Sequence, residues 1–406
     1  MTDVDPDVVR SLRRLLSRRS VLRGASAAGL LAAGGPLLAA CGGKDDAGTS
    51  GQQAATTDLS DKEKVVNFSN WPLYIDVDAK NNKQHPTLDE FTTTNHIKVN
   101  YIEDINDNDQ FFGKIRGDLA AGRDIKRDII VMTDWMAARL IRLNWVQKLD
   151  LTNIPNHTTI QPSLTEVTFD PDRLDAPYSM PWAGIMAGIA YNKKVVDDPV
   201  SSISELLTRP DLKGRVTALT EMHDTIGLTL LGNGIDPADV TDPQFDEAIA
   251  TVEGAVRSGQ IRRFTGNDYT QDLASGNIAA CIAWSGDIVQ LQADNPDIVF
   301  KIPDAGGTLS NDNMMVPNQA QHKKNAETLI NYYYDPVVAA KLAAYVNYIC
   351  PVVGAQAELE KTDPKTANNP LIFPSDAQLA NLHSFKPLDD KTEQSYNAKF
   401  QKVIGG

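Results

Sequence analysis

Residues that commonly carry chemistry do not fall into a familiar catalytic arrangement in this sequence. No HExxH, CxxC or GxSxG motif and no phosphate-binding glycine loop is present, and the six histidines show no metal-ligand spacing. Gly232-Asn233-Gly234 precedes Asp236-Pro237, which is typical of a turn after a helix. A catalytic pair of carboxylates would have no local signature, so a secreted hydrolase stays an alternative. We predict a protein with no catalytic residue, no cofactor and no metal.

The three cysteines indicate two different chemical settings. Cys41 ends the segment Leu38-Ala39-Ala40-Cys41, which resembles a lipobox, in which small residues fit a peptidase cleft and the thiol carries a diacylglycerol. Cys281 lies in an apolar run and Cys350 precedes a proline. In an oxidising compartment these two could form a disulfide, and two buried free thiols fit the sequence equally well.

Residues 1–40 have the pattern of an export signal. Six arginines lie among the first 23 residues, and Ser17–Arg23 resembles the twin-arginine motif. The uncharged stretch Gly24–Ala40 is too short and too rich in glycine for a membrane span, and it fits the apolar region of a signal peptide. We predict a twin-arginine signal peptide with a lipobox over 1–40, a lipid on Cys41 and a flexible tether over 41–62. The mature protein would be anchored to the outer face of the cell membrane, on the periplasmic side.

The charge of the chain limits its partners. The formal net charge is −14, so the protein offers no basic surface that could displace the counterions of nucleic acid. An acidic protein can attract a cationic solute, and acidity also keeps an exported protein soluble. The hydrophobic share of 42% and the charged share of 23% are normal for a folded protein. Nothing in the sequence indicates an oligomer, and we expect a monomer.

The elements that must position any site alternate between short strands and helices. Runs rich in β-branched residues predict strands at 65–68, 97–102, 128–132, 185–191, 215–219, 278–283 and 298–302. Apolar residues at helical spacing predict helices at 88–94, 109–121, 202–207, 225–231, 244–256, 270–274, 286–292, 324–334, 336–345 and 391–403. Asp134 is a plausible N-cap for a further helix that reaches Arg142. This alternation indicates an α/β fold.

Six segments in order along the chain resemble the polyamine-binding proteins of bacterial ABC transporters, the spermidine- and putrescine-binding periplasmic family. Each segment is short, and the set spans residues 65 to about 350. The segments are Asn70-Trp71-Pro72-Leu73-Tyr74, Asp128–Trp135, Pro177–Trp182 leading to Gly188–Asn192, Ile282–Asp287, Asp312–Pro317 and Tyr348–Pro351.

The resemblance implies a two-lobed periplasmic binding protein type II fold with a ligand cleft between the lobes. Lobe 1 would hold residues 64–182 and 286–347, and lobe 2 would hold residues 186–282 and 351–406. The lobes would close around a ligand by a hinge motion that an ABC permease and its ATPase sense. The partners would therefore be a small amine, the permease with its ATPase, and the membrane through Cys41, with no nucleic acid.

The resemblance also assigns roles to residues of the cleft. Trp71 and Tyr74 would line it, Thr133 would form a hydrogen bond, and Trp135 would be a wall. Trp284 would stack on the ligand and Asp287 would bind an ammonium. Asp312 would be the second carboxylate and Tyr348 would close one side near the hinge. Each tryptophan could instead belong to the core, Asp287 could cap a helix and Asp312 could lie in a turn.

The chain departs from the family pattern where the family carries further acids. Leu73, Met222 and Thr225 stand at those positions, and Glu221 or Asp224 could substitute after a small shift. With fewer carboxylates, a diamine, a monoamine or a modified amino compound fits better than a long polyamine. Our hypothesis is a lipid-anchored importer receptor for spermidine, putrescine or a related amine. The alternatives are a receptor for another solute, such as an amino-acid derivative or a metal complex, and a structural lipoprotein.

Overall fold

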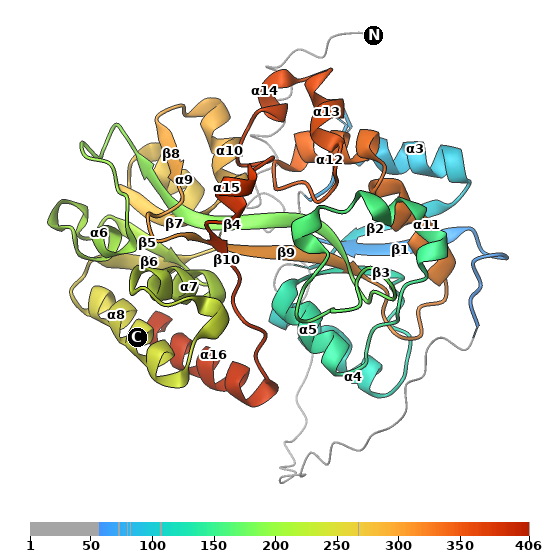
Figure 1. Cartoon of the computed structure of the whole chain (residues 1–406), viewed down its shortest axis with the longest axis horizontal. Coiled ribbons are helices and arrows are strands. Elements are labelled where there is room, and N and C mark those ends of the chain that lie inside the picture. Colours follow the sequence, from blue (N-terminus) through green and yellow to red (C-terminus); the bar gives the residue numbers. More distant parts are fainter. Residues whose placement is uncertain are drawn as a thin grey trace, which may run out of the picture.

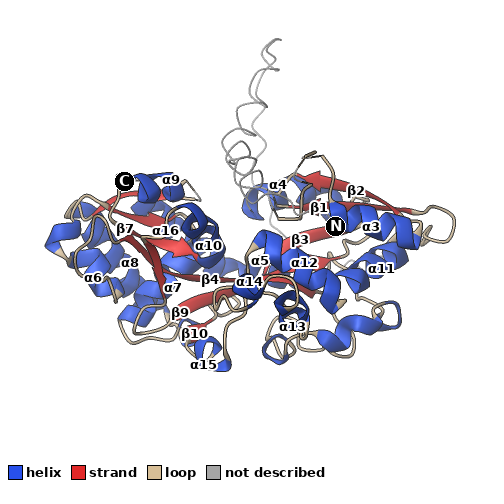
Figure 2. Cartoon of the chain, turned by 90° about the horizontal axis from the view of Figure 1, so that it is seen from above, coloured by secondary structure: helices blue, strands red, loops and turns tan. Residues whose placement is uncertain are grey.

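The computed structural model has two lobes that lie side by side (Figures 1 and 2). It describes residues 57–71, 74–78, 80–81, 83–105, 108–266 and 268–405. The predicted signal peptide at 1–40, the lipidation site Cys41, most of the tether and Leu73 lie outside the described residues. Among the residues that are described, no helix has the length and apolar character needed to cross a membrane.

One mixed sheet runs through both lobes. Its strand order is β2-β1-β3-β9-β4-β7-β5-β6, with β10 beside β9 and β8 beside β4. The two long strands β4 and β9 pair antiparallel and cross from one lobe to the other (Figure 1). The strands are β1 (Val65–Asn70), β2 (Lys98–Glu103), β3 (Ile129–Thr133), β4 (Met180–Asn192), β5 (Val216–Leu219), β6 (Ile261–Thr265), β7 (Ala280–Trp284), β8 (Ile298–Lys301), β9 (Gly307–Met315) and β10 (Leu382–His383).

Helices cover the sheet in both lobes. The first lobe carries α3 (Pro86–Asn95), α4 (Asn108–Ala120), α5 (Asp134–Arg142), α11 (Lys323–Tyr333), α12 (Pro336–Val346), α13 (Ala355–Glu360) and α14 (Pro364–Ala367). The remaining helices are α6 (Ile203–Thr208), α7 (Met222–Gly232), α8 (Asp242–Arg257), α9 (Tyr269–Ser275), α10 (Ser285–Asp294), α15 (Asp376–Leu379) and α16 (Asp390–Ile404). Short 3-10 turns occupy Leu151–Asn153, Pro155–Thr159, Pro162–Leu164, Pro210–Leu212 and Pro237–Asp239.

The ends of several helices follow from local sequence. Ser202 and Glu205 form a capping box at α6, which satisfies the first free backbone N–H groups of that helix. Asp134, which we expected to cap α5, is instead its first residue, and Thr133 takes the cap position. Thr133 makes no side-chain cap there, because its hydroxyl donates to Asp312 across the sheet, at 2.7 Å.

The cores of the two lobes correct the expected division of the chain in two places. Ile288 of α10 and Ile298 of β8 pack in the same core as β5, β7 and α8, so residues 286–301 lie with lobe 2. Val352 and Leu359 pack in the core of β1, β3 and α12, so residues 352–372 lie with lobe 1. Cys281 and Cys350 are buried free thiols in different cores.

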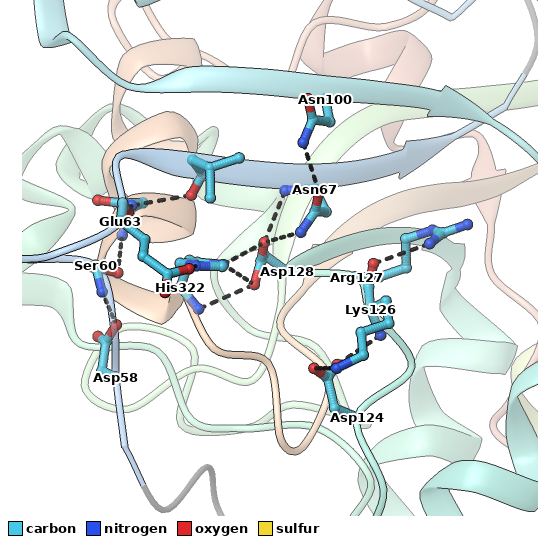
Figure 3. Close-up of polar contacts among 12 residues, drawn as sticks. Asp58, Ser60, Glu63, Asn67, Asn100, Asp124, Lys126, Arg127, Asp128 and His322 are labelled. Atoms are coloured by element: carbon cyan, nitrogen blue, oxygen red, sulfur yellow. Dashed lines mark hydrogen bonds and ion pairs between the residues drawn. The ribbon is translucent and has the colours of Figure 1, made fainter.

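A buried histidine holds the chain before β1 against the start of α11 (Figure 3). His322 is 5% exposed, and its Nδ1 lies 3.1 Å from both carboxylate oxygens of Asp128. Its Nε2 lies 3.0 Å from Oε2 of Glu63. Asp128 also accepts from the backbone N–H of Asn67, at 2.8 Å. Burial lowers the pKa of His322, but the hydrogen bond to Glu63 and the charge of Asp128 outweigh it and raise the pKa overall.

This arrangement predicts a pH-dependent contribution to stability. Because folding raises the pKa of His322, its stabilising effect is complete below the unfolded value of about 6.5 and is lost as pH rises through the folded value. We expect His322→Gln to lower the free energy of unfolding by about 1–3 kcal/mol at pH 6, and by clearly less at pH 9. Urea unfolding at both pH values measures this. His157→Gln is the control, because Nδ1 of His157 contacts only a local carbonyl, that of Ile154. An equal loss at both pH values would contradict the prediction.

Candidate ligand-binding site

Five of the residues assigned to the site are linked side chain to side chain where the two lobes meet. Thr133 ends β3 and lies opposite Asp312 of β9 in the antiparallel register. Tyr74, which follows β1, lies close enough to Asp312 to lower the pKa of its carboxyl. The rings of Tyr74 and Tyr348 meet edge to face, with centroids 5.4 Å apart, and the Tyr348 hydroxyl donates to Asp287 at 3.3 Å. The structure therefore brings two carboxylates, one from β9 and one from α10, to the same aromatic pair.

Asp312 is a buried carboxylate with a perturbed protonation equilibrium. The residue is 4% exposed. Burial raises its pKa to about 6, and the negative charges of Asp134 and Glu221 act in the same direction. The hydrogen bond from Thr133 and the neighbouring Tyr74 stabilise the ionised form and limit the rise. Asp312 is therefore not simply a turn residue.

Asp287 lies in the first turn of α10 and accepts from two tyrosines. The Tyr269 hydroxyl donates to it at 2.9 Å, in addition to Tyr348. The α10 helix begins at Ser285, so Asp287 does not cap it. Gly286 permits this geometry, because a Cβ there would lie 2.6 Å from the ring of Tyr348. Any side chain at position 286 would push Tyr348 away from Asp287.

A third buried carboxylate, Asp224, holds the indole of Trp284. Nε1 of Trp284 donates to Asp224 at 2.7 Å, and the Thr308 hydroxyl donates to the other carboxylate oxygen at 2.8 Å. Burial raises the pKa of Asp224 to about 6, with a further rise from the charge of Glu221. The Trp284 ring is half-buried at the end of β7, and its backbone N–H donates to the Tyr269 hydroxyl. Trp284 is thus fixed beside Asp287 through Tyr269.

The other two tryptophans that were assigned to the site, Trp71 and Trp135, have different surroundings. Trp71 is half-buried between two core clusters of lobe 1, and its indole N–H donates to the carbonyl of Val131 at 3.0 Å. Trp135, in the first turn of α5, stacks on the imidazole of His223 from α7, with centroids 5.3 Å apart. Trp135 therefore contacts the opposite lobe directly.

The far end of α5 adds further contacts between the lobes. Arg142 donates to the carbonyl of Leu388 at 3.1 Å and forms an ion pair with Asp390 of α16. Together with the stacked pair Trp135 and His223, these contacts show that the lobes contact each other along α5.

Asp134 is a further buried acid of this region, and the buried Arg173 lies near it. Its carboxylate accepts from the backbone N–H of Asn311 at 2.8 Å and from the side-chain amide of Asn313 at 2.8 Å. Burial raises its pKa, while Asn313 and the charge of Arg173 oppose the rise. Arg173 donates to Asn313 at 3.1 Å, so it helps to orient the amide that binds Asp134.

The electrostatics of the region favour a cation. Asp224 and Asp312 accept hydrogen bonds from neutral side chains, and no lysine or arginine within the described residues forms an ion pair with either. Two buried carboxylates with raised pKa values would gain from a bound positive charge. In the part of the chain that the structure describes, no three His, Cys, Asp or Glu side chains are grouped to hold a metal ion.

Comparison with known proteins agrees with this geometry. The family of bacterial extracellular solute-binding proteins matches residues 87–374. The chain belongs to this family. The spermidine/putrescine-binding periplasmic protein of Escherichia coli is 24% identical over 349 residues, which cover 86% of this chain and 93% of the relative. The putrescine-binding periplasmic protein PotF of the same organism is 26% identical, with the same coverage.

A solved structure from the same group confirms the fold. A structure described as a putative spermidine/putrescine ABC transporter from Listeria monocytogenes superposes with a TM-score of 0.72 at 25% identity. The alignment covers 84% of this chain and 99% of that one. The two-lobed fold of solute-binding proteins is therefore confirmed, as is the resemblance to the polyamine-binding group. The family acts outside the cytoplasm in solute binding.

Sequence reasoning did not assign Asp224, Tyr269 and His223 to the site. Asp224 was considered only as a substitute acid or a helix cap, and the structure shows Glu221 in the cap position of α7, with Asp224 facing Trp284. The available signal was position: Asp224 lies in the first turn of the helix that follows β5, at the same sheet edge as Trp284. Tyr269 carries no such signal, because its partners Trp284 and Asp287 are more than ten residues away in the sequence. The ring partners of His223, which are Trp135 and Phe385, are also distant in the sequence.

Proposed function

We propose that this protein is an exported solute receptor, anchored by a lipid on Cys41, that binds a polyamine or a related amine for an ABC importer. Spermidine and putrescine are the leading ligands, and the permease and its ATPase are the partners of the closed form. The protein acts as a monomer and performs no chemistry on its ligand. One observation carries the proposal: Asp312 and Asp287 flank the aromatic pair Tyr74 and Tyr348 where the lobes meet.

The physical chemistry of amine capture matches this arrangement. An ammonium group needs hydrogen-bond acceptors and negative charge, and its methylene chain needs apolar walls. Asp312 and Asp287 supply the acceptors, and Trp284 with the tyrosines supplies aromatic faces. A cation–π contact contributes roughly 0.5–2 kcal/mol, so carboxylate and aromatic groups must act together. The named ligands of the relatives from Escherichia coli support the same class.

Calorimetric titration of the purified protein with putrescine and spermidine tests the proposal. We expect saturable binding of at least one of them, and a loss of about ten- to hundredfold in affinity for Trp284→Ala, since the ring supplies both apolar and cation–π contact. Trp145→Ala is the matched control. Trp145 is also half-buried, but it stacks on Phe112 inside lobe 1, with centroids 5.6 Å apart. The control should bind amine as the parent does.

Two results would contradict the proposal. One is the absence of binding for any amine while thermal unfolding shows a folded protein. The other is an unchanged affinity of Trp284→Ala, which would place the ligand elsewhere.

A further inference from the structure

We infer that Glu393 of α16 is a latch between the lobes, which pairs with two arginines of α5 and slows the release of a bound ligand. Its ion-pair partners are not among the residues assigned to the site. Glu393 is therefore a positioning residue, because it acts through the contact between the lobes. The inference rests on the proposed function for the choice of ligand.

The ends of α5 and α16 that contact each other carry opposite charges. Arg139 and Arg142 lie in the last turn of α5, and Asp390 and Glu393 lie in the first turn of α16. Residues three apart lie on one face of a helix, so each helix presents a pair of like charges. α5 packs in a core with β3 of lobe 1, whereas α16 packs with α8 in the core of lobe 2 (Figure 1). The attraction between these charges therefore acts across the junction of the lobes.

Both arginines form an ion pair with Glu393. Nη1 of Arg139 lies 3.8 Å from Oε1 of Glu393, and Nη2 of Arg142 lies 3.8 Å from its Oε2. Glu393 is only 4% exposed. Burial raises its pKa, and the charge of Arg139 is the first of the effects that oppose the rise. Lobe 2 thus buries a carboxylate at a place where lobe 1 supplies the compensating cations.

The latch has room to tighten. Charge-assisted N–H···O bonds are about 2.7–2.9 Å long, so both ion pairs of Glu393 are longer than direct hydrogen bonds. Within the described residues, Nε of Arg139 and Oε1 of Glu393 are buried and make no hydrogen bond. Such groups are rare and costly, and a closer approach of α16 to α5 is the movement that can pair Oε1 of Glu393 with a guanidinium. This distinguishes the latch from a contact that the fold of one lobe fixes.

Stopped-flow mixing with putrescine and with spermidine tests the latch, with tryptophan fluorescence as the signal. The observed rate rises with amine concentration, and its slope and intercept give the association and dissociation rate constants. Glu393→Gln keeps the size of the side chain and removes its charge, so it should raise the dissociation rate constant at least about fivefold. Glu253→Gln is the matched control, because Glu253 pairs with Arg257 within α8 and should leave both rate constants unchanged.

A double variant identifies the partner of Glu393. Arg142→Met should also speed release, and Glu393→Gln/Arg142→Met should show less than the product of the two single effects, because both changes remove the same ion pair. A full product would mean that Glu393 acts without Arg142, and would overturn the latch. A lower association rate constant with an unchanged dissociation rate constant would overturn it too, since Glu393 would then only attract the cationic amine.

Small-angle X-ray scattering without ligand separates the latch from the proposed function. Loss of the latch weakens the contact between the lobes, so Glu393→Gln/Arg142→Met should have a larger radius of gyration than the parent and Glu253→Gln. Equal radii for the three proteins would overturn the latch, whatever the ligand is. If the parent binds neither amine, the proposed function is rejected and the radius of gyration alone decides the inference.

Discussion

Replacing Asp312 with asparagine should remove most of the amine affinity and, at the same time, make the ligand-free protein more stable at neutral pH. Burial raises the pKa of Asp312 to about 6, well above the value of about 3.9 for an unfolded aspartate. Between these values the folded state holds a proton that the unfolded state has lost, so stability falls as pH rises from about 4 to 6. Above pH 6 the ionised side chain costs the fold about 2–3 kcal/mol.

A bound ammonium changes the sign of this effect. The charge of the ligand compensates the buried carboxylate, which then contributes to affinity instead of opposing folding. Loss of one partner of a buried, hydrogen-bonded charge pair costs about 2–5 kcal/mol, so Asp312→Asn should bind putrescine or spermidine at least about thirtyfold more weakly. Asparagine is of the same size and its carbonyl can still accept from Thr133, so the local packing should persist.

Two measurements check both halves of this prediction. Urea unfolding without ligand should show Asp312→Asn more stable than the parent at pH 8, with a smaller difference at pH 4.5. Calorimetry at pH 8 should show the loss of binding. Asp118→Asn is the control, because the Asp118 side chain is 46% exposed and pairs with Arg123 at the surface. A variant that is less stable than the parent at pH 8 would show that ionised Asp312 stabilises the empty fold, contrary to our argument.

The alternation of strands and helices could be predicted from the sequence, but three strands could not: β6, β9 and the two-residue β10. The buried strands of both lobes are apolar and β-branched, which is why β1, β3, β5 and β7 were expected close to where they lie. β9 was missed because Asn311, Asp312 and Asn313 interrupt any apolar pattern. These residues are buried for a physical reason that a single sequence does not show, namely their bonds to Asp134, Thr133 and Arg173. β6 was missed because two arginines interrupt it.

The candidate site was predictable only in part, for a similar reason. The family resemblance selected Asp312, Tyr74, Tyr348 and Asp287, and the structure links them. It also made Trp135 a wall of the cleft, and the structure shows the ring of Trp135 stacked on His223. Contacts between α5 and α7 depend on how the lobes meet, and the spacing of residues within either helix carries no information about that. For the same reason, the sequence did not show that residues 286–301 pack with lobe 2 and residues 352–372 with lobe 1.

Exchanging Arg173 for methionine should be strongly destabilising, although its setting Asp170-Pro171-Asp172-Arg173 has the composition of a surface turn. Arg173 is 2% exposed. Its guanidinium donates to the carbonyl of Leu164 at 2.9 Å and to the Ser179 hydroxyl at 2.8 Å. Burial lowers its pKa, which shows the cost of desolvation, and the charges of Asp134 and Asp170 oppose that change. The charges of Asp134 and Asp170, together with these hydrogen bonds, therefore compensate the cost of burying the guanidinium inside lobe 1.

Removal of this guanidinium leaves buried acceptors and carboxylates without their cation, for which about 3–5 kcal/mol is expected. We predict a loss of this size in the free energy of unfolding of Arg173→Met by urea titration. Arg257→Met should change it by no more than about 0.5 kcal/mol, because Arg257 is exposed and pairs with Glu253 on one face of α8. Because Arg173 also orients Asn313 beside Asp134, any Arg173→Met protein that remains folded should bind amine more weakly. If Arg173→Met proved as stable as Arg257→Met, the buried network around Arg173 would have to relax freely. The amide of Asn313 would then bind Asp134 without help from the arginine.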